Sequence, residues 1–377
     1  MAIRAKITPS VLRWALSRAD LSEDGLASKL GTKAERIRTW LDGDAQPTFN
    51  QAQRLAKAAY IPFGFLFLPE PPEEELPLPD LRTVRNKAIR ESSPELQDVI
   101  KQVLRKQAWY VDYLRDHDHS ELEFVGSCSI NDEVNTVVEK IKNNLGVSRP
   151  SSGNWQDYHR DLVQAAERIG IMVMRAGIVG SNTHRKLSVK EFRGFAIADK
   201  LAPVVFINSS DAPAARLFTL VHELAHIWLG ESGISSASTG EGKKEEVFCN
   251  EVAGEFLVPK NELMNYWDER EGWQTNVSLL VARFHVSKLV LARRALEAGL
   301  VEHDEYRNFY ATEMQAFKDS DSSGGSFYRN AGARNSRQFS VAVVTEALRG
   351  GILLRDAGAL LNIPPNKIKQ YAGELQL

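Results

Sequence analysis

The chain has 377 residues, more than one hydrophobic core usually organises, so two or three domains are expected. Hydrophobic residues make up 43% of it and charged residues 25%, which are ordinary values for a globular protein. The formal net charge of -2 excludes a chain that is basic throughout, so any surface that binds nucleic acid must be local.

The N-terminal residues and the cysteine content predict a soluble, cytoplasmic protein. The first residues include no apolar stretch of the kind that a signal peptide needs, and no later segment approaches the roughly 18 uncharged apolar residues of a membrane span. The only cysteines are Cys128 and Cys249, too few for a disulfide framework, which fits a reducing compartment. A zinc site would therefore use His and carboxylate ligands, and we expect no membrane partner.

Residues 1–68 are predicted to form an all-α module of the helix-turn-helix type. Helix starts and stops recur there at short intervals, which indicates four short helices. The second begins at Ser22 and ends at Gly31, and Thr32 is predicted to cap a third helix over residues 33–41. A short pair of helices joined by a tight turn is the arrangement with which many regulators enter the major groove of DNA.

Basic charge is concentrated in this module, since residues 1–60 hold ten Lys or Arg and six Asp or Glu. Ile37 and Trp40 would anchor the third helix in the core, which leaves its basic side chains exposed. We expect three residues of this helix to contact DNA: Lys33, Arg36 and Arg38. Because operators of such domains are usually two-fold symmetric, DNA binding would imply a homodimer. The alternative is a protein-interaction domain whose basic side chains are only solvated.

Prolines and acidic residues at 69–85 predict a linker. Residues 86–300 are predicted to form an α+β domain, with helices around a small sheet, and residues 301–377 a helical C-terminal region. Three strands are expected, at residues 171–174, 192–198 and 204–207. Residues 277–296 and 353–371 also resemble helix-turn-helix pairs in pattern, and we interpret both as structural because tight helical pairs commonly pack without touching DNA.

Residues 222–226 carry the pattern H-E-x-x-H inside a mostly apolar segment that is typical of a buried helix. His222 and His226 would lie on one face of that helix about a turn apart, so both imidazoles can bind one Zn2+ ion. Glu223 would lie beside the metal, where it can accept a proton from the attacking water and pass it to the leaving amine. The alternative is a pair of helical histidines that form ordinary hydrogen bonds in the core.

Four segments resemble the ImmA/IrrE-type metallopeptidases, which are often fused to Xre-type helix-turn-helix domains: FTLVHELAHIWLG, EEVFCNEVAGEFLVP, FRGF and SGGSFYR. The resemblance implies a zincin-like peptidase domain after the N-terminal module, mainly helical with a small sheet. In that family the pattern E-x-x-[AC]-N supplies a gluzincin-like third ligand, and here it falls on Glu246, Cys249 and Asn250. The resemblance further implies cleavage of a partner repressor or regulator, although some such fusions accompany toxins and look like antitoxins.

Helix geometry favours the same third ligand among the acidic residues of this segment. On a helix, Glu246 shares its face with the small residues Cys249 and Ala253, so that face can approach the zinc helix closely. Glu245 instead shares its side with bulky apolar residues that suit the core. Asn250 is expected to accept a hydrogen bond from a ligand imidazole, and a helix-packing amide is the alternative.

Two further roles are predicted near the metal. Tyr328 would lie over the site and stabilise an oxyanion, with a loop aromatic of no catalytic role as the alternative. The FRGF segment would form the edge of the sheet, where its backbone pairs with an extended peptide substrate. The residues of this predicted edge strand are Phe192, Arg193, Gly194 and Phe195.

Three functions are compatible with these motifs. The favoured one is a zinc-dependent endopeptidase that controls transcription, with activity that depends on a signal or partner. The second is a DNA-binding repressor or antitoxin that keeps a structural or silent zinc site. The third is a zinc hydrolase that acts on a non-peptide bond. We favour the first because Glu223 is retained, and a purely structural site does not need it.

Overall fold

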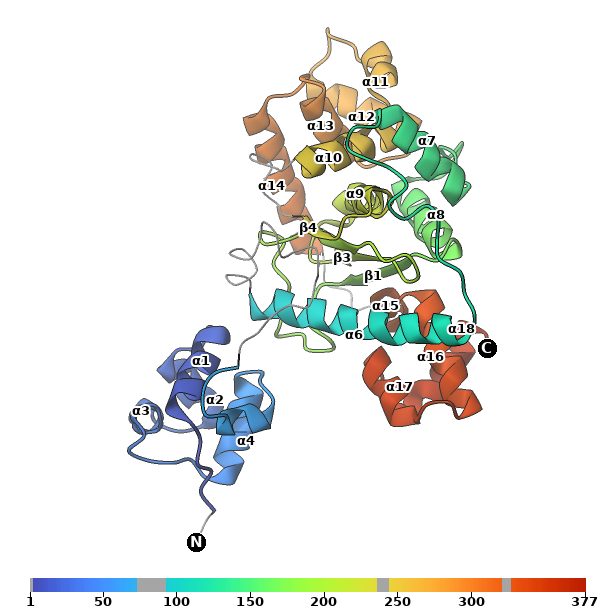
Figure 1. Ribbon diagram of the computed structural model, residues 1–377. Helices are drawn as coiled ribbons and strands as arrows, with labels where there is room; N and C mark the ends of the chain where they lie inside the picture. Colours follow the sequence, from blue (N-terminus) through green and yellow to red (C-terminus); the bar gives the residue numbers. More distant parts are fainter. Residues whose placement is uncertain (1–2, 73–92, 236–243, 321–326) are drawn as a thin grey trace. The chain divides into compact units, whose positions relative to one another are not determined.

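The computed structural model describes residues 3–72, 93–235, 244–320 and 327–377, and it describes side chains in these ranges except at 317–320 and 327–330 (Figure 1). The described residues form two compact units. The first holds residues 3–72 and 93–98, and the second runs from Val99 to Leu377. Most of the predicted linker lies outside the described residues.

The first unit is all-helical, with α1 (Pro9–Arg18), α2 (Glu23–Leu30), α3 (Ala34–Asp42), α4 (Phe49–Ala58) and the 3-10 helix η1 (Phe63–Phe67). The Ser22 side chain caps α2 by accepting a hydrogen bond from the backbone N–H of Gly25. Apolar side chains from all four α-helices form one core, in which Ile37 and Trp40 of α3 are buried.

The third helix begins one residue later than predicted. Lys33, not Thr32, is the N-cap of α3, and no side chain caps it. The backbone N–H of Thr32 instead donates to the carbonyl of Ala27, behind Gly31 in the left-handed conformation. Thr32 therefore belongs to the Schellman-type end of α2 and does not start α3.

The second unit contains helices before, between and after the strands of one small sheet. Their bounds are α6 (Pro94–Asp116, which starts in the first unit), α7 (Val134–Leu145), α8 (Trp155–Arg168), η3 (Pro213–Ala215), α9 (Arg216–Leu229), α10 (Lys244–Leu257), α11 (Lys260–Tyr266), α12 (Trp273–Phe284), α13 (Lys288–Glu297), α14 (His303–Ser320), α15 (Phe327–Asn335), α16 (Arg337–Arg349), α17 (Leu354–Leu361), η4 (Pro365–Lys367) and α18 (Ile368–Leu375). The protein is therefore mainly helical and α+β. None of the described helices is long and apolar enough to cross a membrane.

The sheet has four strands, β1 (Met172–Ala176), β2 (Gly194–Ile197), β3 (Val204–Asn208) and β4 (Gly233–Ser235), in the order β1-β3-β2-β4. β1 and β3 are parallel, whereas β2 is antiparallel to both β3 and β4. The prediction that the FRGF strand forms the sheet edge is wrong. β4, which follows α9 in the chain, pairs with the side of β2 that was expected to be open, so β4 and not β2 is the strand at this edge of the described sheet.

α9 is the centre of the core of the second unit, and it lies on one side of the sheet while α6 and α15 lie on the other (Figure 1). It packs against β2 and β3 and is surrounded by α7, α8 and α10. Nearly every residue of α9 is buried, from Leu217 to Trp228. A helix that is apolar on all sides needs such a position, because no face of it suits water.

The C-terminal helices belong to the same compact unit as the predicted peptidase domain, and the structure places no boundary at residue 300. α15 and α16 pack against β1. On α6, Lys106 donates a 2.7 Å hydrogen bond to the Asn335 side chain, and the Trp109 ring meets the Phe339 ring edge-on. The end of the chain thus forms one layer on the sheet.

Candidate metal centre

The H-E-x-x-H motif lies on α9, whose register in the core is fixed at its C-terminal end. Gly230 ends the helix in the left-handed conformation, with a φ of 71°. A Cβ atom at Gly230 would come within 2.9 Å of the Cα of Gly126, so the two loops approach at a distance that only glycine permits. His222 and His226 therefore occupy fixed places in the interior.

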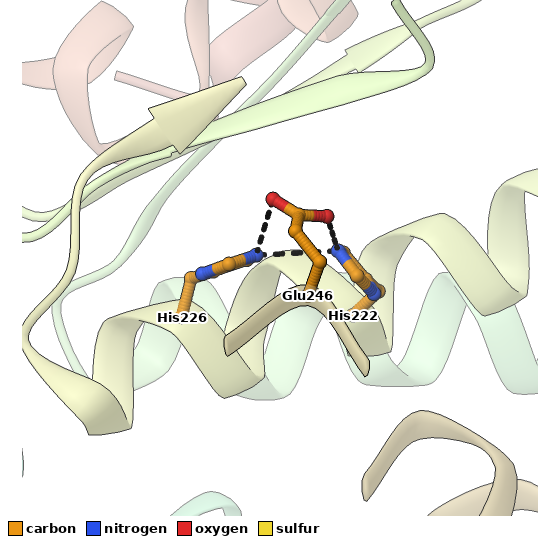
Figure 2. A group of neighbouring side chains, drawn as sticks. All are labelled: His222, His226 and Glu246. Carbon is orange, nitrogen blue, oxygen red and sulfur yellow. Dashed lines mark hydrogen bonds and ion pairs between the residues drawn. The ribbon is translucent and has the colours of Figure 1, made fainter. Parts of the chain in front are cut away.

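Three potential metal ligands converge on one point. The Nε2 atoms of His222 and His226 are 3.2 Å apart. Glu246, from the first turn of α10, places one carboxylate oxygen 3.4 Å from the Nε2 of His222 and the other 3.7 Å from the Nε2 of His226. Figure 2 shows this carboxylate over both imidazoles. Both histidines are buried, and the Glu246 side chain is 18% exposed.

These distances fit one tetrahedral zinc ion better than direct hydrogen bonds. Two nitrogens that each lie about 2.0–2.1 Å from a shared tetrahedral zinc ion are separated by about 3.3 Å. The separations between donors of the three residues, 3.2 to 3.7 Å, are close to that value, and 3.7 Å is too long for a hydrogen bond. Two imidazoles and a carboxylate are also the ligand set of many hydrolytic zinc sites. Within the described ranges, these residues form the one cluster of His, Cys and acidic side chains able to hold a metal.

Glu246 rather than its neighbours reaches the histidines because α10 packs against α9 through small residues. Cys249 and Ala253 are fully buried between the helices, in the same core as α9. Burial and the nearby Glu246 raise the pKa of the Cys249 thiol well above its usual value, and Cys249 is not among the three converging ligands. Glu245 lies outside the metal-binding cluster.

Asn250 does not support an imidazole in this structure. In the described part of the chain, Nδ1 of His222 is buried without a hydrogen bond, and Asn250 donates or accepts none. The Asn250 side chain is half-buried on α10, and its role beside a metal-bound imidazole stays a prediction.

Ser235 is a polar neighbour of the site that sequence reasoning missed. Its hydroxyl oxygen is 3.0 Å from the Nε2 of His222, and the residue is buried at the end of β4. The backbone N–H of Arg193 donates to the Ser235 carbonyl, which ties this end of β4 to the neighbouring strand. No spacing rule singles out Ser235, because only the pairing of β4 with β2 brings it to the histidines.

Glu223 is completely buried against β2, and Gly194 makes this position available. A Cβ atom at Gly194 would lie 2.5 Å from a carboxylate oxygen of Glu223 and 2.9 Å from the carbonyl oxygen of Phe206. Real Cβ atoms do not approach other atoms so closely. The glycine of the FRGF segment therefore leaves room for the carboxylate that the sequence assigns to proton transfer.

The other residues of the FRGF segment have structural contacts and do not offer a free backbone edge. Phe192 and Phe195 are buried, and the Phe195 ring stacks on Phe206 with centroids 4.7 Å apart. The Arg193 guanidinium lies 3.4 Å from the buried Asp211 carboxylate and over the Tyr310 ring. The Arg193 carbonyl accepts a hydrogen bond from the N–H of Asn208, so the backbone is paired toward β3 as well as β4.

The other predicted site residues are Tyr328 and three basic residues of the first unit. Tyr328 falls in the first turn of α15, but its side chain lies outside the described residues. In the first unit, Lys33, Arg36 and Arg38 are exposed on or next to α3. The Arg38 guanidinium forms a 2.7 Å ion pair with Glu23 of α2. Arg38 would have to break this ion pair to contact DNA, so Arg36 is the better candidate for a DNA contact.

Comparison with known families gives a match to the central part of the chain. Residues 166–296 match the model of the IrrE N-terminal-like domain, of the M78 peptidases. This range contains the four strands and both helices of the metal centre. The match implies a metallopeptidase role and a metal that in this family is typically zinc. Residues 335–374 match a domain of unknown function, DUF8813. No curated protein matches the chain.

Proposed function

We propose that the protein is a zinc-dependent endopeptidase linked to transcriptional regulation, which cleaves a partner repressor or regulator. The observation that carries this proposal is the convergence of His222, His226 and Glu246 beside the buried Glu223. His222, His226 and Glu246 would hold the metal. When bound there, zinc would act as a Lewis acid that acidifies water and polarises the scissile carbonyl.

Glu223 is the general base and then the general acid of this proposal. It accepts a proton from the attacking water and passes the same proton to the nitrogen of the leaving amine, so the carboxylate ends in its starting state. Its burial beside Gly194 holds it in one place on α9, between the two histidines of the motif. A fixed base needs no reorganisation when the proton moves.

An extended substrate peptide would pair with β4, because the backbone of β2 is already used on both sides. This places the peptide next to Ser235, whose hydroxyl adjoins the histidines. The Ser235 hydroxyl can donate a hydrogen bond to a substrate carbonyl oxygen, a role that the sequence alone did not suggest.

The proposal is tested by incubating the full-length protein with total cell protein in the presence and absence of a chelator. We expect a specific fragment that disappears when the metal is removed and returns when zinc is added back. A fragment that persists with the chelator would contradict a metal-dependent reaction. If no fragment forms in any condition, the binding-protein alternative described below is supported instead.

Gly194→Ala tests the position of the base. A methyl group there would displace the Glu223 carboxylate, so we expect hydrolysis to fall at least about tenfold and stability by about 1–3 kcal/mol, as overpacking typically does. Bound zinc should stay near stoichiometric because the ligands are on other residues. Gly373→Ala on α18, outside the proposed site, is the control, since a Cβ there meets nothing within 4 Å. Hydrolysis at the wild-type rate in Gly194→Ala would show that Glu223 does not depend on this space.

The first unit is proposed to bind operator DNA through α3. Arg36→Ala should weaken specific binding by about 1–3 kcal/mol if the arginine reads a base, and Arg38→Ala should have the smaller effect because Arg38 is paired with Glu23. Lys57→Ala, an exposed cation on α4, is the control for loss of charge. Binding is measured at several salt concentrations. Absence of any salt-sensitive DNA affinity would assign the unit to protein recognition.

A second candidate, a repressor or antitoxin with a silent zinc site, is favoured by one observation. The Ser235 hydroxyl lies 3.0 Å from the Nε2 of His222, where it can act as a further ligand and close the site. In that case Glu223→Gln would leave regulation in the cell unchanged, whereas a peptidase that acts on a regulator requires Glu223. The two candidates are thus separated by a single variant.

A further inference from the structure

A cavity of about 510 Å³ in the second unit shares no residue with the metal centre. It lies where the parallel strands β1 and β3 end, with Arg175 and Ile207 near the last positions of those strands. α8 forms another wall, and Gly332 and Arg337 bring α15 and α16 to its rim. Crevices at the carboxyl ends of parallel strands are frequent ligand sites in α/β sheets, and cavities of about 300–1,000 Å³ suit small organic molecules.

The lining of this cavity is strongly cationic. Among the described residues, four arginines and one histidine line it, and Glu167 is the acidic side chain of that lining. The Glu167 carboxylate accepts a 2.9 Å hydrogen bond from the backbone N–H of Arg337. Arg216 donates to the carbonyl oxygens of Ser209 and Asp211, so its guanidinium is held by the loop before α9. Arg160 is paired with Asp157, at 2.9 Å, and with Asp161, so the positive charge available to a ligand rests on the other arginines of the lining.

Two groups in the wall lack protein partners. Within the described part of the chain, no hydrogen bond or ion pair engages the guanidinium of Arg175, although the residue is half-buried on β1. The Nε2 atom of His159 on α8 is buried and also makes no hydrogen bond. Burial, with the charges of Arg175 and Arg216 adding to it, lowers the pKa of His159 to about 4. Both groups therefore lack a protein partner and can form hydrogen bonds to a bound anion.

The start of α9 and an apolar surface complete the described lining of the cavity. Pro213 and Arg216 belong to the lining, so the first turn of a 14-residue helix lies at the cavity wall. The backbone N–H of Arg216 donates to the Pro213 carbonyl of η3, and the N–H of Ala212 donates to the buried Asp211 carboxylate, so these amides are already engaged. On another part of the lining, Trp155, Val163 and Val173 present apolar surface. A ligand must therefore combine an anionic group with an apolar or aromatic body.

We propose that this cavity binds a small organic phosphate monoester, about the size of a nucleoside monophosphate, with the phosphate at Arg175 and His159 and the body against Trp155. A phosphate matches the site better than a carboxylate, because its two charges and three terminal oxygens can engage a guanidinium and an imidazole together. This binding requires neither zinc nor Glu223, so its test does not depend on whether the proposed peptidase activity is found.

Calorimetric titration of the full-length protein tests this inference with a panel of AMP, UMP, glucose 6-phosphate and pyridoxal 5′-phosphate, and with adenosine and benzoate as probes that lack a phosphate. We expect at least one monoester to bind and its dephosphorylated or carboxylate counterpart to bind at least tenfold more weakly. Arg175→Met should weaken the binding at least tenfold. Arg168→Met is the matched control, since Arg168 is an exposed cation on α8 that does not line the cavity.

A second variant keeps the test informative if Arg175→Met does not fold. His159→Leu removes the buried ring nitrogen at similar volume and should also weaken binding, while circular dichroism and thermal unfolding without ligand confirm that each variant is folded. Several outcomes would overturn the inference: no monoester of the panel binds, adenosine or benzoate binds as tightly as the monoesters, or Arg168→Met weakens binding as much as Arg175→Met. The last result would indicate only general attraction of anions.

Discussion

Glu223→Gln is expected to lower peptide hydrolysis by about 10²- to 10⁴-fold, the contribution typical of a general base, while zinc remains bound. Glutamine has nearly the size and shape of glutamate, so it fits the buried space next to Gly194. It cannot accept the proton of the attacking water. Zinc should stay close to one equivalent because the proposed ligands are the two histidines and Glu246.

The measurement pairs the rate of fragment formation with the zinc content of the same preparation. His222→Ala serves as the comparison, because removal of a proposed ligand should lose both activity and zinc. Loss of zinc in Glu223→Gln would show that Glu223 holds the metal and that the assignment as a base is wrong. Unchanged hydrolysis in Glu223→Gln would rule out proton transfer through this residue.

Glu246→Ala is expected to reduce zinc affinity strongly, because it removes a proposed ligand. Loss of an outer-shell partner already costs about 10- to 100-fold, and the loss of a ligand should cost more. Its carboxylate oxygens lie 3.4 Å and 3.7 Å from the Nε2 atoms of the two histidines, and alanine leaves only the imidazoles. Hydrolysis should fall with the zinc occupancy. Zinc affinity is measured by competition with a chelator of known strength.

Glu245→Ala is the matched control for this prediction, since it removes the same charge one position earlier on α10. Glu245 lies outside the metal-binding cluster, so zinc affinity should change little. If Glu245→Ala lost zinc and Glu246→Ala kept it, the conclusion that the Glu246 side of α10 faces α9 would be wrong. Circular dichroism checks that α10 still forms in both variants.

The local pattern of residues determined which segments are helical and which face of each is buried. Ile37 and Trp40 have the spacing of a core face, and both are buried in the first unit. The apolar residues around H-E-x-x-H predicted a buried helix, which is α9. Likewise, the small residues at Cys249 and Ala253 indicated which side of α10 approaches α9, and hence which glutamate meets the histidines. These features follow from side-chain size and helical periodicity, which act over one or two turns.

Tertiary structure alone decided the features that depend on pairing between distant segments. β4 has only three residues, too few for an alternating pattern, yet its pairing with β2 turns the predicted edge strand into an interior one and brings Ser235 to His222. In the sequence, Gly194 is simply a glycine within a predicted strand. Its close approach to Glu223 arises only because β2 packs on α9. The cationic cavity joins α8, β1, α9 and α16, and no local pattern relates residues so far apart in the chain. The physical reason is that strand pairing and cavity walls depend on long-range contacts, whereas the hydrophobic periodicity of a sequence reports only the element in which it occurs.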